Sequence, residues 1–167
     1  MAKLSLDGLY EEYARDVLRY LLSLSADRST AEDMMQETFY RAYLHIEDLQ
    51  DEKVRPWLFR VAQNAYIDHI RKRKKESLTS DEFFTGLKDT GASVEHRVFQ
   101  QEKLGEVIKR MQRLPEPQKQ ALLLVTVHDF TYREASEILR TSESNTRLLV
   151  FRARKKLRDF ERGEEDE

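Results

Sequence analysis

Residues 131–160 read TYREASEILRTSESNTRLLVFRARKKLRDF, and this stretch decides the predicted fold of the C-terminal part of the chain. Thr131 and Glu134 have the spacing of a capping box, in which a hydroxyl and a carboxylate satisfy backbone N–H groups at a helix start. A turn at residues 140–142 follows, and Ser142 can then cap a longer helix. A short capped helix, a tight turn and a longer cationic helix are typical of a helix-turn-helix.

The outer face of this final helix combines cations with apolar side chains. Helical phase places Leu148 and Phe151 outward among Arg147, Arg152 and Lys155. A solvated basic face is the usual explanation of such a run. The exposed apolar residues favour DNA contact instead, because cations bind phosphates and apolar groups touch thymine methyl groups.

A second informative stretch is residues 55–75, RPWLFRVAQNAYIDHIRKRKK, which predicts a long helix with two different faces. The face that includes Leu58, Ala62 and Tyr66 is expected to be buried, with His69 as a packed histidine rather than a metal ligand. The opposite face carries the polar residues, one aliphatic residue and cations: Arg60, Asn64, Ile67 and Arg71, flanked by Gln63 and Asp68.

Two more amphipathic helices are predicted before residue 50. The first, over residues 4–24, has a buried stripe that includes Tyr10 and Leu21. The second is expected to begin with a capping box at residues 29–32 and to bury Met34 and Phe39. Its other face is polar but holds an aromatic and an aliphatic residue, which favours a protein interface over a merely solvated surface: Asp33, Gln36, Glu37, Tyr40 and Leu44.

The chain is therefore predicted to be all-α, with two small helical domains joined by a flexible linker and a helix-turn-helix in the C-terminal one. The scarcity of Gly (5) and Pro (3) favours long helices over sheets. Residues 76–100 lose helical periodicity and are too long for an ordinary loop. The expected domains are residues 1–75 and 101–161, followed by an acidic tail at 162–167.

Composition and motifs exclude several classes of function. The chain of 167 residues has no cysteine and a net charge of −2, but its cations and acids are clustered in separate segments. The sequence has no membrane-spanning run and no signal peptide, so a cytoplasmic location is expected. It also lacks a phosphate loop, a nucleophile elbow and a metal-binding motif. We expect no catalytic residue, no metal, no cofactor and no small-molecule substrate, and hence no enzyme.

Three segments, in this order, carry a resemblance to a known family: AEDMMQETFYRAY (31–43), the stretch 55–75, and LPEPQKQALLLVTVHDFTYREASEIL (114–139), followed by the basic final helix. Together they resemble the extracytoplasmic-function (ECF) sigma factors of bacterial RNA polymerase, above all sigma-M-type members from the Bacillus group. The resemblance implies a protein that binds core RNA polymerase, recognises the −10 and −35 promoter elements and promotes DNA melting at stress-response genes.

The resemblance also assigns residues to partners. Contact with the β′ clamp helices of core polymerase falls on Asp33, Gln36, Glu37, Tyr40 and Leu44. Contact with the −10 element falls on Lys53, Arg55, Arg60, Asn64, Ile67, Asp68, Arg71 and Arg73. Contact with the −35 element falls on Ser144, Asn145, Arg147, Leu148, Phe151, Arg152 and Lys155. Further expected partners are the β flap of polymerase and an anti-sigma factor, typically membrane-bound. Leu149 replaces a cation common in the family, so the base preference cannot be copied from relatives.

Two other functions fit parts of the sequence. A helix-turn-helix regulator acting without core polymerase would bind duplex DNA alone, and it has no use for the helix of residues 55–75. An anti-sigma or adaptor-type interaction protein would bind polymerase without promoter specificity.

Overall fold

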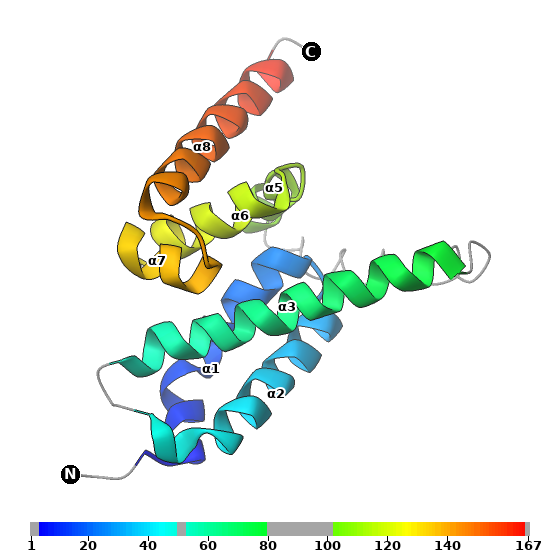
Figure 1. The fold of residues 1–167 in the computed structure, drawn as a ribbon. Coiled ribbons are helices and arrows are strands. Elements are labelled where there is room, and N and C mark those ends of the chain that lie inside the picture. Colours follow the sequence, from blue (N-terminus) through cyan, green and yellow to red (C-terminus); the bar gives the residue numbers. More distant parts are fainter. Residues whose placement is uncertain (1–3, 50–52, 80–101, 166–167) are drawn as a thin grey trace.

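The computed structural model describes residues 4–49, 53–79 and 102–165, and within those ranges the chain forms helices and no strand (Figure 1). The N-terminal half contains α1 (Leu6–Ser25), α2 (Arg28–Leu44), the short 3₁₀ helix η1 (Ile46–Asp48) and α3 (Val54–Thr79). The C-terminal half contains α5 (Glu102–Met111), α6 (Glu116–Leu122), the π-helical segment η3 (Leu123–Val127), α7 (Tyr132–Leu139) and α8 (Glu143–Glu165). The all-α prediction is confirmed.

The junction between α1 and α2 is tight, and it corrects one predicted cap. α1 ends at Ala26, which has a left-handed backbone with φ of 56°. The next residue, Asp27, is the N-cap of α2, and its Oδ1 accepts a hydrogen bond from the Ser29 backbone N–H at 3.2 Å. The capping box predicted at residues 29–32 is wrong, because α2 already begins at Arg28 and Glu32 pairs with that arginine at 3.0 Å.

The N-terminal half packs around the apolar stripes of its three long helices. Leu21 of α1, Phe39 of α2 and Leu58 of α3 are all buried, and full burial of one such side chain stabilises the fold by about 1.5–3 kcal/mol. Tyr10, predicted in the buried stripe of α1, is instead 49% exposed, although its ring meets that of Phe39 edge-on with centroids 5.1 Å apart.

α3 is longer than its predicted range. It continues to Thr79, so the first residues of the predicted linker are helical. The rest of that segment, residues 80–100, lies outside the described residues. Along α3 the predicted core face is confirmed, since Leu58, Ala62 and Tyr66 are buried and His69 is partly buried.

The helix-turn-helix of the C-terminal half forms as the local sequence predicts. Thr131 Oγ1 accepts from the Glu134 N–H at 3.1 Å, and Glu134 Oε1 accepts from the Thr131 N–H at 3.0 Å. α7 ends at Arg140, whose φ of 56° places it in the left-handed region. Ser142 Oγ then accepts from the Asn145 N–H at 3.0 Å and caps α8.

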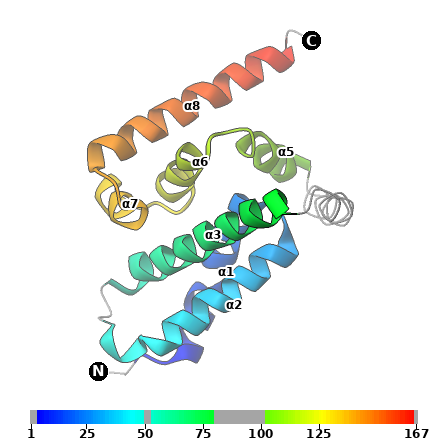
Figure 2. The same ribbon diagram turned by 45° about the vertical axis from the view of Figure 1, so that its right-hand side comes forward.

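The two halves are packed against each other. α3 lies between the α1–α2 pair and α7 in both views (Figures 1 and 2). Phe59 of α3 meets Phe130, which precedes α7, with ring centroids 4.9 Å apart. One cluster of buried side chains therefore runs through both halves.

Candidate nucleic-acid interface

The outer face of α8 is the first candidate DNA-binding surface. All seven residues predicted there are exposed, including Leu148 at 42% and Phe151 at 60%. Arg147 pairs with Glu143 at 3.0 Å and lies over the ring of Tyr132. Because exposed ion pairs contribute little, that arginine can exchange its partner for a phosphate or a base edge at small cost.

A groove beside the N-terminal part of α3 is the second candidate surface. It has a volume of about 570 Å³, and three of the predicted −10 residues line it, namely Lys53, Arg60 and Asn64. Arg41 of α2 and Arg140 of α7's C-terminus also line it. The cations make the electrostatic potential in this groove more positive, which attracts a phosphate backbone. The partly buried Trp57 also lines the groove and supplies an aromatic ring against which a base can stack.

The other predicted −10 residues lie outside this groove. Ile67, Asp68 and Arg71 continue along α3, where the Asp68 carboxylate pairs with Arg41 at 3.1 Å. Arg73 lines a different pocket of about 300 Å³, between α3 and the C-terminal half. Arg55 turns away from the groove to the C-terminal half: its guanidinium donates to the His128 backbone oxygen at 2.7 Å.

An aromatic patch on α1 and α2 is the third candidate surface. The predicted polymerase-contacting residues are all exposed, with Tyr40 at 59% and Leu44 at 58%. Two exposed tyrosines absent from that prediction, Tyr10 and Tyr43, lie beside Tyr40 along an apolar groove of about 350 Å³. In the sequence, the spacing of Tyr40 and Tyr43, one turn apart on the exposed side of α2, is the signal that could have identified Tyr43.

The contact between the halves buries several polar groups. Gln63, predicted on the exposed side of α3, is instead buried: its Oε1 accepts from the Tyr20 hydroxyl and its Nε2 donates to Gln120 Oε1 at 2.6 Å. Lys119 is also buried, and its Nζ donates to the Leu24 backbone oxygen at 2.8 Å.

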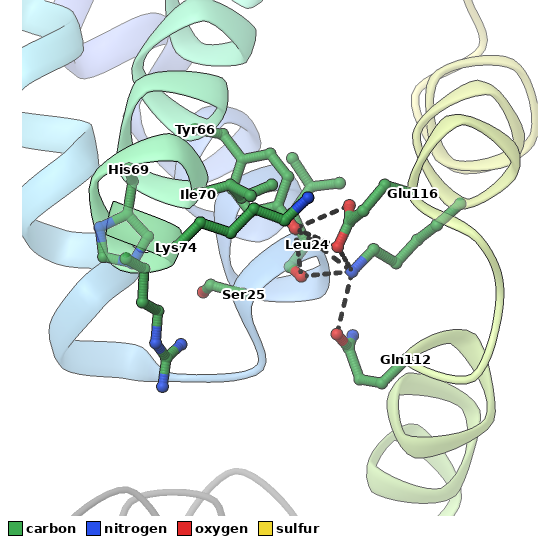
Figure 3. A pocket seen from close by; sticks show the side chains of 10 residues that line it. Leu24, Ser25, Tyr66, His69, Ile70, Lys74, Gln112 and Glu116 are labelled. Carbon is green, nitrogen blue, oxygen red and sulfur yellow. Dashed lines mark hydrogen bonds and ion pairs between the residues drawn. The ribbon is translucent and has the colours of Figure 1, made fainter. Parts of the chain in front are cut away.

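Burial shifts the pKa values of groups in this contact. Burial lowers the pKa of Lys119, while the Glu116 carboxylate at 3.1 Å opposes the shift. Burial also raises the pKa of the Tyr66 hydroxyl, which donates to that carboxylate (Figure 3). The pKa of His128 falls to about 4, chiefly because burial disfavours the charged imidazolium, although Asp16 lies 3.8 Å from its Nδ1.

The part of the chain that the structure describes offers no group of three or more His, Asp or Glu side chains arranged to hold a metal ion. None of its described helices combines the length and the apolar character needed to cross a membrane. What the described surfaces offer is binding: a cationic helix face, a cationic groove and an aromatic patch.

Comparison with known proteins identifies the family. Residues 9–76 match the model of Sigma-70 region 2, and residues 104–157 match that of Sigma-70, region 4. Over 167 aligned residues the chain is 42% identical to "ECF RNA polymerase sigma factor SigM" of Bacillus subtilis (strain 168), and the match covers 98% of this chain and 100% of that relative. The chain belongs to the ECF sigma factors. The prediction of that family from the sequence is confirmed.

Solved structures show the same fold. The sigma factor RpoE, in complex with the anti-sigma factor NepR from Bartonella quintana, matches with a TM-score of 0.76 at 22% identity, covering 92% of this chain and 94% of RpoE. CnrH, in complex with the cytosolic domain of CnrY, matches with a TM-score of 0.69 at 19% identity, covering 95% of this chain and 88% of CnrH. In this ECF sigma factor, the aromatic patch lies in region 2 and the α8 face lies in region 4, while the α3 groove is lined by region 2 except for Arg140 of region 4.

Proposed function

We propose that this ECF sigma factor binds core RNA polymerase, directs it to promoters of stress-response genes through the −10 and −35 elements, and promotes DNA melting. The chain performs no chemistry in this role. The observation that carries the proposal is the presence of two separate cationic surfaces together with an aromatic patch. A regulator that binds only duplex DNA needs the α8 surface, whereas the α3 groove and the patch would serve it no purpose.

The aromatic patch is proposed to dock on the β′ clamp helices. Tyr40, Tyr43 and Leu44 are more than half exposed, and a cluster of exposed apolar groups within a polar rim is typical of a protein interface. The nearby carboxylates of Asp33 and Glu37 are exposed as well, so the surface suits a partner helix that presents apolar and cationic side chains. Region 4 is proposed to contact the β flap.

The α8 face is proposed to enter the major groove at the −35 element. A helix-turn-helix places the N-terminal residues of its second helix against base edges. Those positions hold Ser144, Asn145, Arg147 and Leu148, all exposed. Phe151, Arg152 and Lys155 follow on the same exposed face, where cations can hold the flanking phosphates.

The α3 groove is proposed to hold the unpaired −10 strand. Flipping a base from the duplex costs a few kcal/mol, and stacking plus phosphate contacts must offset that cost. Asn64 can present an amide to a base edge, while Lys53 and Arg60 hold phosphates along the same groove. Ile67, Asp68 and Arg71 would extend this contact along α3, and Arg55 and Arg73 would join it once they are released from their present surroundings.

We also propose that a membrane-bound anti-sigma factor binds this chain. The binding would take place in the cytoplasm, where the chain is expected to reside. Two observations support this partner. The chain belongs to the ECF sigma factors, and its two structural neighbours were solved in complexes, one with the anti-sigma factor NepR and the other with the cytosolic domain of CnrY. Such a partner would cover the polymerase-binding surface until a signal releases it.

A run-off transcription assay with purified core polymerase tests the function. Adding the chain should produce discrete promoter-dependent transcripts that core polymerase alone does not make. A helix-turn-helix regulator would bind the template without initiating, and an adaptor would bind polymerase without selecting a start site. Either result would overturn the proposal.

A further inference from the structure

The turn of the helix-turn-helix holds Asn145 through two neighbouring hydroxyl groups. Ser142 Oγ accepts from the backbone N–H of Asn145 at 3.0 Å. Thr141 Oγ1 accepts from the side-chain Nδ2 of the same residue at 2.8 Å. Since Ser142 already caps α8, the bond to Thr141 is not needed to satisfy the backbone, and its effect is to orient the amide group of Asn145.

Thr141 is itself held in place. Its backbone N–H donates to the Ser136 backbone oxygen at 3.0 Å, and the residue is partly buried. The preceding residue, Arg140, has the left-handed backbone that ends α7. The Thr141 hydroxyl therefore has a defined place on the turn, and the amide bonded to it loses part of its rotamer freedom before any DNA is bound.

The oriented amide keeps the groups that a base edge requires. The bond to Thr141 uses one of the two Nδ2 hydrogens, and among the described residues neither the second hydrogen nor Oδ1 has another hydrogen-bond partner. An asparagine with these groups available can bond to adenine in the major groove, where its Oδ1 accepts from N6 and its Nδ2 donates to N7. Asn145 is exposed in the first turn of α8, among the positions that a helix-turn-helix places against base edges.

An amide in a defined orientation distinguishes adenine from other bases better than a freely rotating one. Guanine carries the O6 acceptor where adenine carries its N6 donor, so Oδ1 in the same position would face a second acceptor and the contact would be lost. A freely rotating amide must be immobilised when it binds adenine but not when it meets another base, and this cost lowers the preference for adenine. The bond to Thr141 reduces that cost before binding.

We propose that Thr141 is a positioning residue for −35 recognition, which orients Asn145 to select adenine at one position of the element. The inference rests on the proposed function of the α8 face. It assigns a base to one position of the element and a role to a turn residue outside the predicted contact set. A bidentate amide contact should favour adenine over the other bases by about 5-fold to 100-fold.

Transcription by core polymerase with the full chain provides the test. The probe is a set of linear duplex templates derived from one promoter at which the parent chain directs starts, with each base pair of the upstream element replaced in turn by the other three. Barcoded run-off transcripts give the preference for each base at each position. Thr141→Val removes the hydroxyl while nearly keeping the side-chain shape, and Thr141→Ser retains the hydroxyl. Thr126→Val is the matched control, because Thr126 is an exposed threonine of region 4 whose hydroxyl accepts from Arg154 at 3.5 Å.

Asn145→Ala should abolish the preference for adenine at one position of the upstream element. Thr141→Val should reduce the preference at that same position by about 2-fold to 10-fold, because the amide must then be ordered on binding. It should leave the base preferences at the other positions unchanged, and it should have no further effect when combined with Asn145→Ala. Thr141→Ser and Thr126→Val should match the parent chain.

Three results would overturn the inference. The first is an adenine preference that Asn145→Ala leaves intact at every position. The second is a loss of preference at many positions in Thr141→Val, which is the result expected if the residue only supports the turn or contacts a phosphate. The third is an equal effect of Thr141→Val with and without Asn145. Absence of promoter-dependent transcripts with the parent chain would instead contradict the proposed sigma function and, with it, the −35 role of Asn145.

Discussion

The hydrogen bond between Gln63 and Gln120 allows the packing of the two regions to be measured as a coupling energy. Gln63→Ala leaves the Tyr20 hydroxyl and Gln120 Oε1 without their buried partner. Since each buried polar group left unsatisfied costs about 1–3 kcal/mol, this variant should lose about 2–4 kcal/mol in the free energy of unfolding. Gln120→Ala leaves only Gln63 Nε2 unpaired and should lose about 1–3 kcal/mol.

The double variant decides whether the two side chains interact in solution. Because both partners are then absent, it should lose about 1–2 kcal/mol less than the sum of the single variants. Urea denaturation followed by circular dichroism gives the free energy of unfolding of the two single variants and of the double variant. Gln36→Ala, on the exposed face of α2, is the control, and it should change stability by less than about 0.5 kcal/mol and add independently to Gln120→Ala. Strict additivity of Gln63→Ala and Gln120→Ala would refute the packing described for α3 and α6.

Three further outcomes follow from the structure. Because the pKa of His128 is about 4 in the folded chain and about 6.5 when unfolded, the unfolded chain binds more protons between those values, and stability should fall by up to about 3 kcal/mol as pH drops from 6.5 to 4. His128→Leu should flatten this part of a denaturation profile, and an identical profile would exclude the buried neutral imidazole. Asn64→Ala should impair promoter melting about tenfold or more while leaving duplex binding nearly unchanged, and normal permanganate reactivity of the −10 region would contradict the proposed base contact. Replacing Asp33 and Gln36 together by Ala should weaken co-elution with core polymerase and leave the melting temperature within a few degrees of the parent, and undiminished co-elution would exclude this face from docking.

Local features of the fold could be predicted from the sequence because their causes are local. The capping box of Thr131 and Glu134 involves residues three positions apart, and the Ser142 cap acts on a neighbour at the same spacing. Helical periodicity likewise identified the buried face of α3. The predicted box at residues 29–32 failed for an equally local reason, since Asp27 provides the cap two residues earlier.

The contact between the regions could not be predicted in this way. Gln63 bonds to a residue 57 positions away and Arg55 to one 73 positions away. Periodicity predicted Gln63 on the exposed side of α3, whereas the residue is buried where α1 and region 4 meet that helix, bonded to Tyr20 on one side and to Gln120 on the other. The prediction for Tyr10 was wrong in the opposite sense, since this residue was expected to be buried and is half exposed. An aromatic residue can pack one edge of its ring against a neighbour, here Phe39, and expose the rest. The roles of individual residues at polymerase and DNA remain predictions.

Sequencing the 5′ ends of transcripts made in vitro shows whether this chain directs core polymerase to promoters with two sequence elements. Core polymerase, this chain and a pool of genomic DNA fragments are combined, and start sites that depend on the chain are aligned. We expect a defined set of starts that share two sequence elements at a constant spacing. Arg147→Ala should reduce the dependence of the starts on the upstream element, and Asn64→Ala should reduce their dependence on the downstream element. Starts that are unchanged by adding the chain, or that share no upstream sequence, would contradict the proposed function.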